Sequence, residues 1–130
     1  MSNNFAPWGP QLWSGINAII RWFPENPTKE QKEHFKNFFM SLAYVLPCDI
    51  CKEHYFNELS KVDWKNVLQN RFTLIKWRID LQNEINRRKG VPELDYNTAL
   101  EIIESGEIIN QNDFFIYIGI ITMFIIVFII

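Results

Sequence analysis

Apolar residues recur at intervals of three and four along most of this chain, and that spacing constrains the fold more than any other feature. It is the period of an amphipathic α-helix, whereas a half-buried strand alternates every second residue. No strand pattern longer than a few residues and no internal repeat is present. The sequence therefore predicts an all-α fold, a bundle of four helices with a short fifth helix.

Prolines and one capping pattern divide the first half into three predicted helices. The first helix follows Pro10 and stops at Pro24. Thr28, with Gln31 three residues later, forms the capping-box pattern that opens the second helix, and Pro47 ends it and can occupy the first turn of the third. The predicted buried stripes are Leu12, Ile16, Ile19, Ile20 and Phe23, then Phe35, Phe38, Phe39, Leu42 and Leu46.

The second half predicts a long helix and a short one. Residues 60–63 are expected to form a loop, and the fourth helix covers residues 71–89 with Gly90 as its stop. A turn at residues 92–95 leads into the fifth helix. The apolar stripes are Leu74, Leu81 and Ile85 on the fourth helix and Tyr96, Leu100 and Ile103 on the fifth.

Residues 114–130 carry no charge and are almost entirely apolar. A helix of this length spans roughly 25 Å, near the short limit for a bilayer core of about 30 Å. A buried core helix is the alternative, but the run has no polar stripe and follows a polar linker at residues 105–113. We expect a single-pass C-terminal membrane anchor, with residues 1–104 as one globular domain.

Charge excludes one class of partner and leaves the orientation of the anchor open. The net charge is −2 with both signs mixed, so no basic block indicates nucleic-acid binding. No Lys or Arg lies near either end of the apolar run to orient it. Residues 1–7 lack the basic and apolar regions of a signal peptide. We therefore expect the domain on the cytosolic side of its membrane.

The two cysteines of the chain form one C-x-x-C motif, Cys48 and Cys51. A single pair is not the framework of a disulfide-rich secreted domain. Thiols one helical turn apart can close a reducible disulfide, and the helix start behind Pro47 stabilises a thiolate. A thiolate attacks disulfides and electrophilic cofactors, so the motif favours redox catalysis.

Two other interpretations of the pair stay open. Cys48, Cys51 and His54 offer three zinc ligands, but zinc prefers four and the only other histidine is His34. The pair could also be two inert buried cysteines. A thioredoxin-like motif would need a strand before it and a βαβ pattern around it, which the sequence lacks.

Three motifs stand in a fixed order on the first, third and fourth predicted helices. They are W-G-P-x-x-W at residues 8–13, P-C-x-x-C-x-x-H at 47–54, and W-x5-N-x-I-N-R-R-K at 77–89. In this order and at these separations the chain resembles the Erv/ALR family of FAD-linked sulfhydryl oxidases. It is most similar to the short versions carried by large double-stranded DNA viruses, which makes a virion membrane one candidate location. The resemblance covers residues 5–103.

The resemblance implies a four-helix bundle with a short fifth helix and FAD at its mouth, in agreement with the helix count from periodicity. It implies that Cys51 lies next to the flavin and that Cys48 exchanges with the substrate. Reduced flavin would pass two electrons to oxygen and give hydrogen peroxide. Since no shuttle cysteine pair is present, a thioredoxin- or glutaredoxin-like dithiol protein is the expected reductant. The family also implies a homodimer through residues 11–23 and 29–46.

The resemblance further implies a set of cofactor-binding residues. Trp77 and Tyr96 would pack on the adenine or the flavin, while the basic residues 87–89 would reach the diphosphate. Core packing is the alternative for the tryptophans, and interaction with the helix dipole is the alternative for the basic residues. The predicted set is Gly9, Trp13, Asn17, Cys51, His54, Trp77, Gln82, Asn83, Asn86, Arg87, Lys89 and Tyr96.

Asn17 and Gln82 depart from the family pattern, because many members carry a histidine at each position. Both histidines contact the flavin nucleotide in those relatives. Asparagine and glutamine keep hydrogen-bonding capacity but lose the aromatic face. The departure bears on flavin affinity and tuning, and it keeps one alternative function open, a flavin-free membrane-tethered adaptor or metal-binding helical protein.

Overall fold

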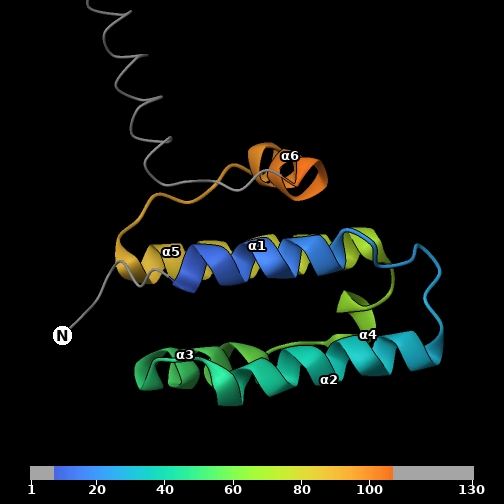
Figure 1. The fold of residues 1–130 in the computed structure, drawn as a ribbon, viewed down its shortest axis with the longest axis horizontal. Coiled ribbons are helices and arrows are strands. Elements are labelled where there is room, and N and C mark those ends of the chain that lie inside the picture. Colours follow the sequence, from blue (N-terminus) through green and yellow to red (C-terminus); the bar gives the residue numbers. More distant parts are fainter. Residues whose placement is uncertain (1–7, 107–130) are drawn as a thin grey trace, which may run out of the picture.

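A computed structural model of the chain describes residues 8–106. Figure 1 shows two helices in one layer, α1 in front of α5, and two in a second layer, α2 and α3; α6 lies beyond the first layer and is seen nearly end on. The described residues are all-α, as the sequence predicted. Their helices are α1 (Trp8–Ile20), α2 (Lys29–Val45), α3 (Asp49–Leu59), α4 (Trp64–Val67), α5 (Arg71–Lys89) and α6 (Tyr96–Ser105).

The predicted capping signals set the helix boundaries. The Gln31 backbone N–H donates to Thr28 Oγ1 at 3.1 Å, and the Thr28 N–H donates to Gln31 Oε1 at 2.9 Å. This is the reciprocal capping box predicted for α2. Gly90 ends α5 in the left-handed conformation, with φ of 68°, which a residue with a side chain adopts less readily. The predicted ends of both helices are confirmed.

Three predictions about the first helix are wrong. It ends at Ile20 and not at Pro24, so Phe23, although buried, lies in the segment after the helix. It begins at Trp8, before Pro10, because a proline in the first turn gives up an N–H that has no helical partner there. Ile19 was expected on the buried stripe but is 43 % exposed. The core takes Ile16 and Ile20 from this helix, and their spacing of four defines a narrower stripe than the sequence suggested.

The one-turn helix α4 is a correction to the predicted helix count. Asp63 caps it by accepting hydrogen bonds from the backbone N–H of Asn66 at 3.4 Å and from Asn66 Nδ2 at 2.7 Å. A single turn is too short for apolar periodicity to reveal, since the period itself is 3.6 residues. The loop predicted at residues 60–63 is present before it.

Two adjoining clusters form the core. The larger contains the largest fully buried side chains of the described residues: Ile20, Phe23, Phe39, Leu74, Ile79 and Ile103. The smaller is formed by Ala43, Leu46, Tyr55, Leu59 and Leu81. Burial of each large apolar side chain contributes about 1.5–3 kcal/mol, so these contacts, rather than helix propensity, hold the helices together.

No helix among residues 8–106 is long and apolar enough to cross a membrane. The predicted anchor at residues 114–130 lies outside the described residues.

Candidate active site

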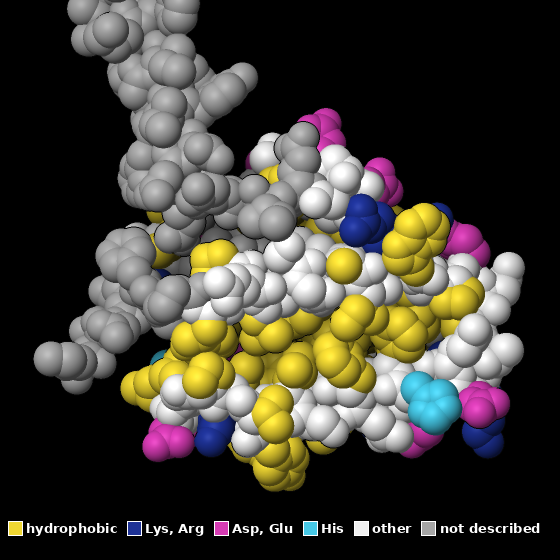
Figure 2. Space-filling model, viewed as in Figure 1, with side chains coloured by type: hydrophobic (Ala, Val, Ile, Leu, Met, Phe, Trp, Pro, Cys, Tyr) yellow, Lys and Arg dark blue, Asp and Glu magenta, His cyan; other side chains and the backbone are white. Residues whose placement is uncertain are grey.

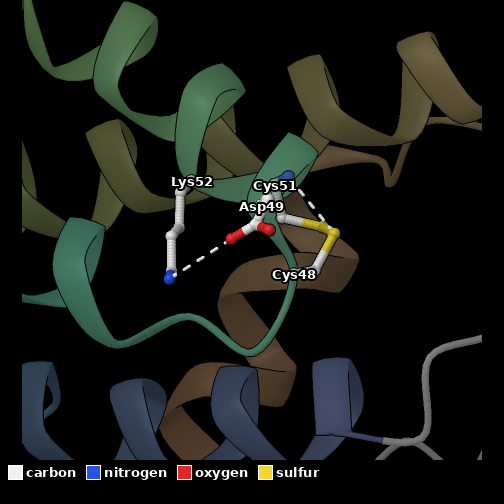
Figure 3. Close-up of a disulfide and its surroundings, with 4 residues drawn as sticks. All are labelled: Cys48, Asp49, Cys51 and Lys52. Carbon is white, nitrogen blue, oxygen red and sulfur yellow. Dashed lines mark hydrogen bonds and ion pairs between the residues drawn. A yellow bond between two sulfur atoms is a disulfide. The ribbon is translucent and has the colours of Figure 1, made fainter.

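A disulfide joins Cys48 and Cys51 at the N-terminus of α3 (Figure 3), with the Cα atoms 5.1 Å apart. Cys48 is the N-cap, and its Sγ accepts a hydrogen bond from the Cys51 N–H at 3.2 Å. The helix begins at Asp49, directly after the cap, so Pro47 precedes the cap and does not occupy the first turn as predicted. Both cysteines are half-buried, so the pair is not the inert buried pair of the third interpretation.

The two sulfurs lie in different environments. Cys48 occupies the cap, where the free N–H groups of the first turn create a partial positive charge that favours a thiolate. Cys51 packs inward against the smaller core cluster. Beside them, Lys52 Nζ lies 3.5 Å from Asp49 Oδ1, and the Asp49 side chain is fully exposed. Cys48 thus lies at the helix cap, and Cys51 lies against the core.

Tyr55 fixes α3 to α2 one helical turn beyond the disulfide. Its hydroxyl donates a buried hydrogen bond of 2.7 Å to the Phe39 carbonyl oxygen. Burial raises the pKa of the Tyr55 phenol well above its usual range, so it stays a neutral donor. A buried hydrogen bond of this kind contributes about 1 kcal/mol and also sets the depth at which α3 lies.

Aromatic side chains line the core behind Cys51. The Trp77 ring lies edge-on to Phe39 at 4.9 Å between centroids, and 5.4 Å from Trp64. Trp13 and Trp77 both pack against the cluster that contacts Cys51. Two predicted cofactor residues from distant parts of the sequence thus share one apolar cluster with the inner cysteine. Trp77 also packs in the core, which was the alternative to cofactor binding for this residue.

Trp77 also borders a cavity within residues 8–106, with a volume of about 460 Å³. Of the predicted cofactor residues, Trp77, Asn83 and Arg87 reach it. Carboxylates outnumber cations in its wall, which suits hydroxyl groups and an aromatic base better than a diphosphate. The lining is Glu58, Lys61, Val62, Asp63, Val67, Trp77, Asp80, Leu81, Asn83, Glu84, Arg87 and Glu93.

Two predicted amide ligands hold the turn after α5. Asn83 Nδ2 donates to the Leu94 carbonyl at 3.0 Å, and the Leu94 N–H donates to Asn83 Oδ1 at 2.8 Å. Asn86 Nδ2 lies 3.5 Å from the Pro92 carbonyl. The Asn83 amide therefore already uses both of its ends, and its role toward ribose or adenine stays a prediction.

The predicted diphosphate ligands are exposed at the C-terminus of α5. Arg87 pairs with Glu84 and Glu93, and these carboxylates raise the pKa of its guanidinium. Arg88 pairs with Glu58 and Glu84. Lys89 is exposed and forms no ion pair within residues 8–106. A phosphate at Arg87 would have to compete with two carboxylates.

Asn17 of α1 and Gln82 of α5 belong to helices that pack together, and Gln82 is bonded to a buried residue that the sequence did not single out. Asn17 is 8 % exposed, and its Oδ1 has no hydrogen-bond partner among the described residues. Gln82 Oε1 accepts from Nη1 of Arg78, whose guanidinium carbon lies 4.3 Å from the centroid of the Trp13 ring. An arginine between Leu74 and Leu81 on the buried stripe was the available signal.

The other three predicted residues are placed differently. Gly9 is in the first turn of α1, and a Cβ added there would meet no described atom within 4 Å. His54 is exposed on α3. The Tyr96 hydroxyl is buried at the start of α6 without a partner in residues 8–106. No three His, Cys, Asp or Glu side chains in this part of the chain are grouped to hold a metal, which leaves the zinc interpretation unsupported.

Comparison with known proteins identifies relatives of this arrangement. Residues 10–104 match the Erv1 / Alr family. A protein of Acanthamoeba polyphaga mimivirus named "Probable FAD-linked sulfhydryl oxidase" is 40 % identical over 98 residues, which cover 75 % of this chain and 68 % of that one. The "Mitochondrial FAD-linked sulfhydryl oxidase erv1" of Schizosaccharomyces pombe is 28 % identical over 87 residues, 67 % of this chain and 48 % of that protein.

A solved structure has the same fold. The FAD binding domain of Erv1 from Saccharomyces cerevisiae superposes with a TM-score of 0.73, covering 82 % of this chain and 98 % of that one. Its sequence identity is 20 %, so the likeness concerns the arrangement of helices.

The double hydrogen bond of Asn83 generates a stability prediction. Asn83→Asp keeps the acceptor for the Leu94 N–H but places a carboxylate oxygen against the Leu94 carbonyl. We expect a loss of about 1–3 kcal/mol in the free energy of unfolding, measured by urea denaturation. Asn37→Asp, an exposed change on α2, is the control and should have little effect. An unchanged midpoint for Asn83→Asp would contradict the role of this side chain in holding the turn.

Proposed function

The chain belongs to the Erv1 / Alr family, and from this premise we infer that it is an FAD-dependent thiol oxidase. The observation that carries the inference is the half-buried Cys48–Cys51 disulfide, placed at a helix N-terminus with its inner sulfur against the cluster that holds Trp13 and Trp77. Its relatives are named for the same chemistry, so a dithiol is the substrate class.

The position of the two sulfurs supports a division of labour. A substrate thiolate attacks Cys48 Sγ, a mixed disulfide forms, and Cys51 leaves as a thiolate toward the core. The second substrate thiol then attacks the substrate sulfur of the mixed disulfide, which releases Cys48 and leaves the substrate oxidised. When bound, FAD would accept the two electrons of the reduced pair and supply them to oxygen, giving hydrogen peroxide.

The residues present fit FAD on several counts. The unpartnered Asn17 Oδ1 and the Tyr96 hydroxyl are buried groups that a heteroaromatic edge could satisfy. Trp13 and Trp77 supply aromatic faces in the cluster that Cys51 packs against, and the cavity beside Trp77 accommodates part of a nucleotide. The acidic cavity wall argues that the diphosphate lies away from it, toward Lys89.

The partner proposed as reductant is a thioredoxin- or glutaredoxin-like dithiol protein. Its support is the surface around the disulfide, where Ile50 is 61 % exposed and the exposed Tyr44 packs edge-on against Phe56 at 5.1 Å. An apolar rim of this kind suits a protein partner rather than a small hydrophilic thiol.

A homodimer through α1 and α2 is the proposed assembly. Figure 2 shows hydrophobic side chains gathered between these two helices, on the face that it presents. Ile19 and Trp22 at the end of α1, and Met40 on α2, are large apolar side chains left exposed. An isologous contact between two such faces would bury them.

A single-pass anchor at residues 114–130, with the oxidase domain on the cytosolic side, is the proposed location. Its support is the uncharged, apolar composition of that run.

The redox function predicts that the purified full-length chain is yellow, with an absorbance maximum at about 450 nm. It should consume oxygen with a dithiol and release hydrogen peroxide. Cys51→Ala should lose at least about a hundred-fold in turnover while keeping its flavin, because the variant lacks only the inner sulfur. A colourless, folded chain would reject the oxidase and favour the flavin-free adaptor.

The dimer predicts that Ile19→Lys converts the protein to a monomer at micromolar concentration, because the substitution places a charge in the buried patch. Light scattering after size exclusion in detergent measures the mass. Phe72→Lys, a change at an exposed apolar residue on α5, is the matched control and should leave the dimer intact. A monomeric wild type, or a dimeric Ile19→Lys, would reject this interface.

The anchor predicts that the full chain stays with membranes after carbonate extraction and that a chain ending at residue 106 does not. Protease added outside sealed vesicles of the producing cell's endomembranes should digest the domain if it faces the cytosol. Equal extraction of both chains would reject the anchor, and full protection of the domain would reverse the proposed orientation.

A further inference from the structure

Arg78 is a charged side chain inside the bundle that the proposed chemistry does not use. It lies on α5, one turn before Gln82, and is 3 % exposed. Its guanidinium stacks over Trp13 of α1 at 4.3 Å, and its Nη1 donates to Gln82 Oε1. No carboxylate of residues 8–106 forms an ion pair with it, although the other arginines of α5, residues 71, 87 and 88, all pair with glutamates.

A buried cation without a counter-ion weakens the fold. Burial lowers the pKa of the Arg78 guanidinium to about 9, so the group still carries its charge at neutral pH. The contact with Trp13 and the bond to Gln82 offset only part of the desolvation cost. Arg78 Nε is buried and has no acceptor in the described part of the chain. The fold therefore holds a positive charge and a free donor that it does not itself satisfy.

The helix that carries Trp13 also holds an acceptor without a donor. Asn17, one turn after Trp13 on α1, has a buried Oδ1 without a partner among residues 8–106. A free donor on the arginine that stacks on Trp13 and a free acceptor one turn after Trp13 do not bond to each other. Since more than about 90 % of buried polar groups in native proteins are paired, these two exceptions on packed helices indicate a ligand that supplies both partners.

We propose that Arg78, bonded to Gln82 and acting with Asn17 of α1, is a cofactor-positioning residue that binds an oxygen-bearing edge of the flavin ring of FAD. The inference rests on the proposed oxidase function and deepens it. We assign Arg78 to the flavin ring and not to the diphosphate because of its neighbour Trp13. Trp13 packs against the same cluster as Cys51, and the ring must approach Cys51. The basic residues 87–89 begin nine positions further along α5, about 13 Å away. A cation at the ring also favours the reduced flavin, on which negative charge accumulates.

A purely structural role for Arg78 makes the opposite predictions. If its contacts with Trp13 and Gln82 served only the fold, Arg78→Met would destabilise the protein with and without FAD to the same extent. If the charge is kept for the cofactor, Arg78→Met should stabilise the flavin-free protein, because it removes an uncompensated buried charge while it keeps the side-chain volume. The same change should weaken the complex with FAD.

The experiment compares full-length wild type, Arg78→Met, Arg78→Lys and the control Lys76→Met. Lys76 is an exposed cation on the same helix, paired with Asp80 at 2.7 Å. After removal of flavin, FAD binding is titrated by fluorescence, thermal midpoints are measured with and without FAD, and the flavin midpoint potential is measured in the loaded proteins. A colourless wild type that takes up no FAD would reject the oxidase function itself.

We expect Arg78→Met to weaken FAD binding about ten- to a hundred-fold, to raise the thermal midpoint of the flavin-free protein by a few degrees, and to lower the flavin potential. Arg78→Lys should be intermediate, since it keeps the charge but loses the planar fork. Lys76→Met should match wild type in FAD binding and potential. Unchanged FAD binding in Arg78→Met, or a lower midpoint without FAD, would overturn the proposal. Weaker binding at an unchanged potential would overturn the assignment to the ring.

Discussion

The docking of α3 on α2 is the contact on which the site depends. It is fixed by the buried hydrogen bond from Tyr55 to the Phe39 carbonyl and by the apolar cluster around Leu59. Because α3 begins at the disulfide, the depth at which this helix lies decides how far each sulfur is buried. Cys48 is left at the cap and Cys51 is turned toward the aromatic core. A shift of α3 along α2 would separate the disulfide from Trp13 and Trp77 while leaving the motif intact.

The polar groups of the bundle divide into two kinds. At the end of α5, Arg87 and Arg88 are exposed and neutralised by neighbouring glutamates, which costs the fold little. Between α1 and α5, Arg78 and Asn17 are buried and incompletely paired. Native proteins tolerate such groups where function requires them. Buried polar groups without partners are therefore better indicators of a cofactor than polar groups that are already satisfied.

Much of this arrangement was predictable from the sequence, for identifiable reasons. Thr28 and Gln31, Pro47 and Gly90 act on their own neighbours along the chain, so the helix ends they mark needed no tertiary information. The one-turn helix α4 could not be predicted because a single turn is too short to show apolar periodicity. The predicted ligand Asn83 was identified as an available amide, but its partner Leu94 lies eleven residues away, across a turn.

The sequence alone determined that this chain is helical, where most helices end, and that a C-x-x-C pair stands at a helix start, because period, capping and proline geometry are local properties. The tertiary structure alone decided which sulfur faces inward, which tryptophans gather behind it, and that Arg78 lies buried on Trp13 without a counter-ion. Those outcomes depend on how helices from distant segments pack. Burial without a counter-ion gives the Arg78 charge a desolvation cost that an exposed arginine does not have.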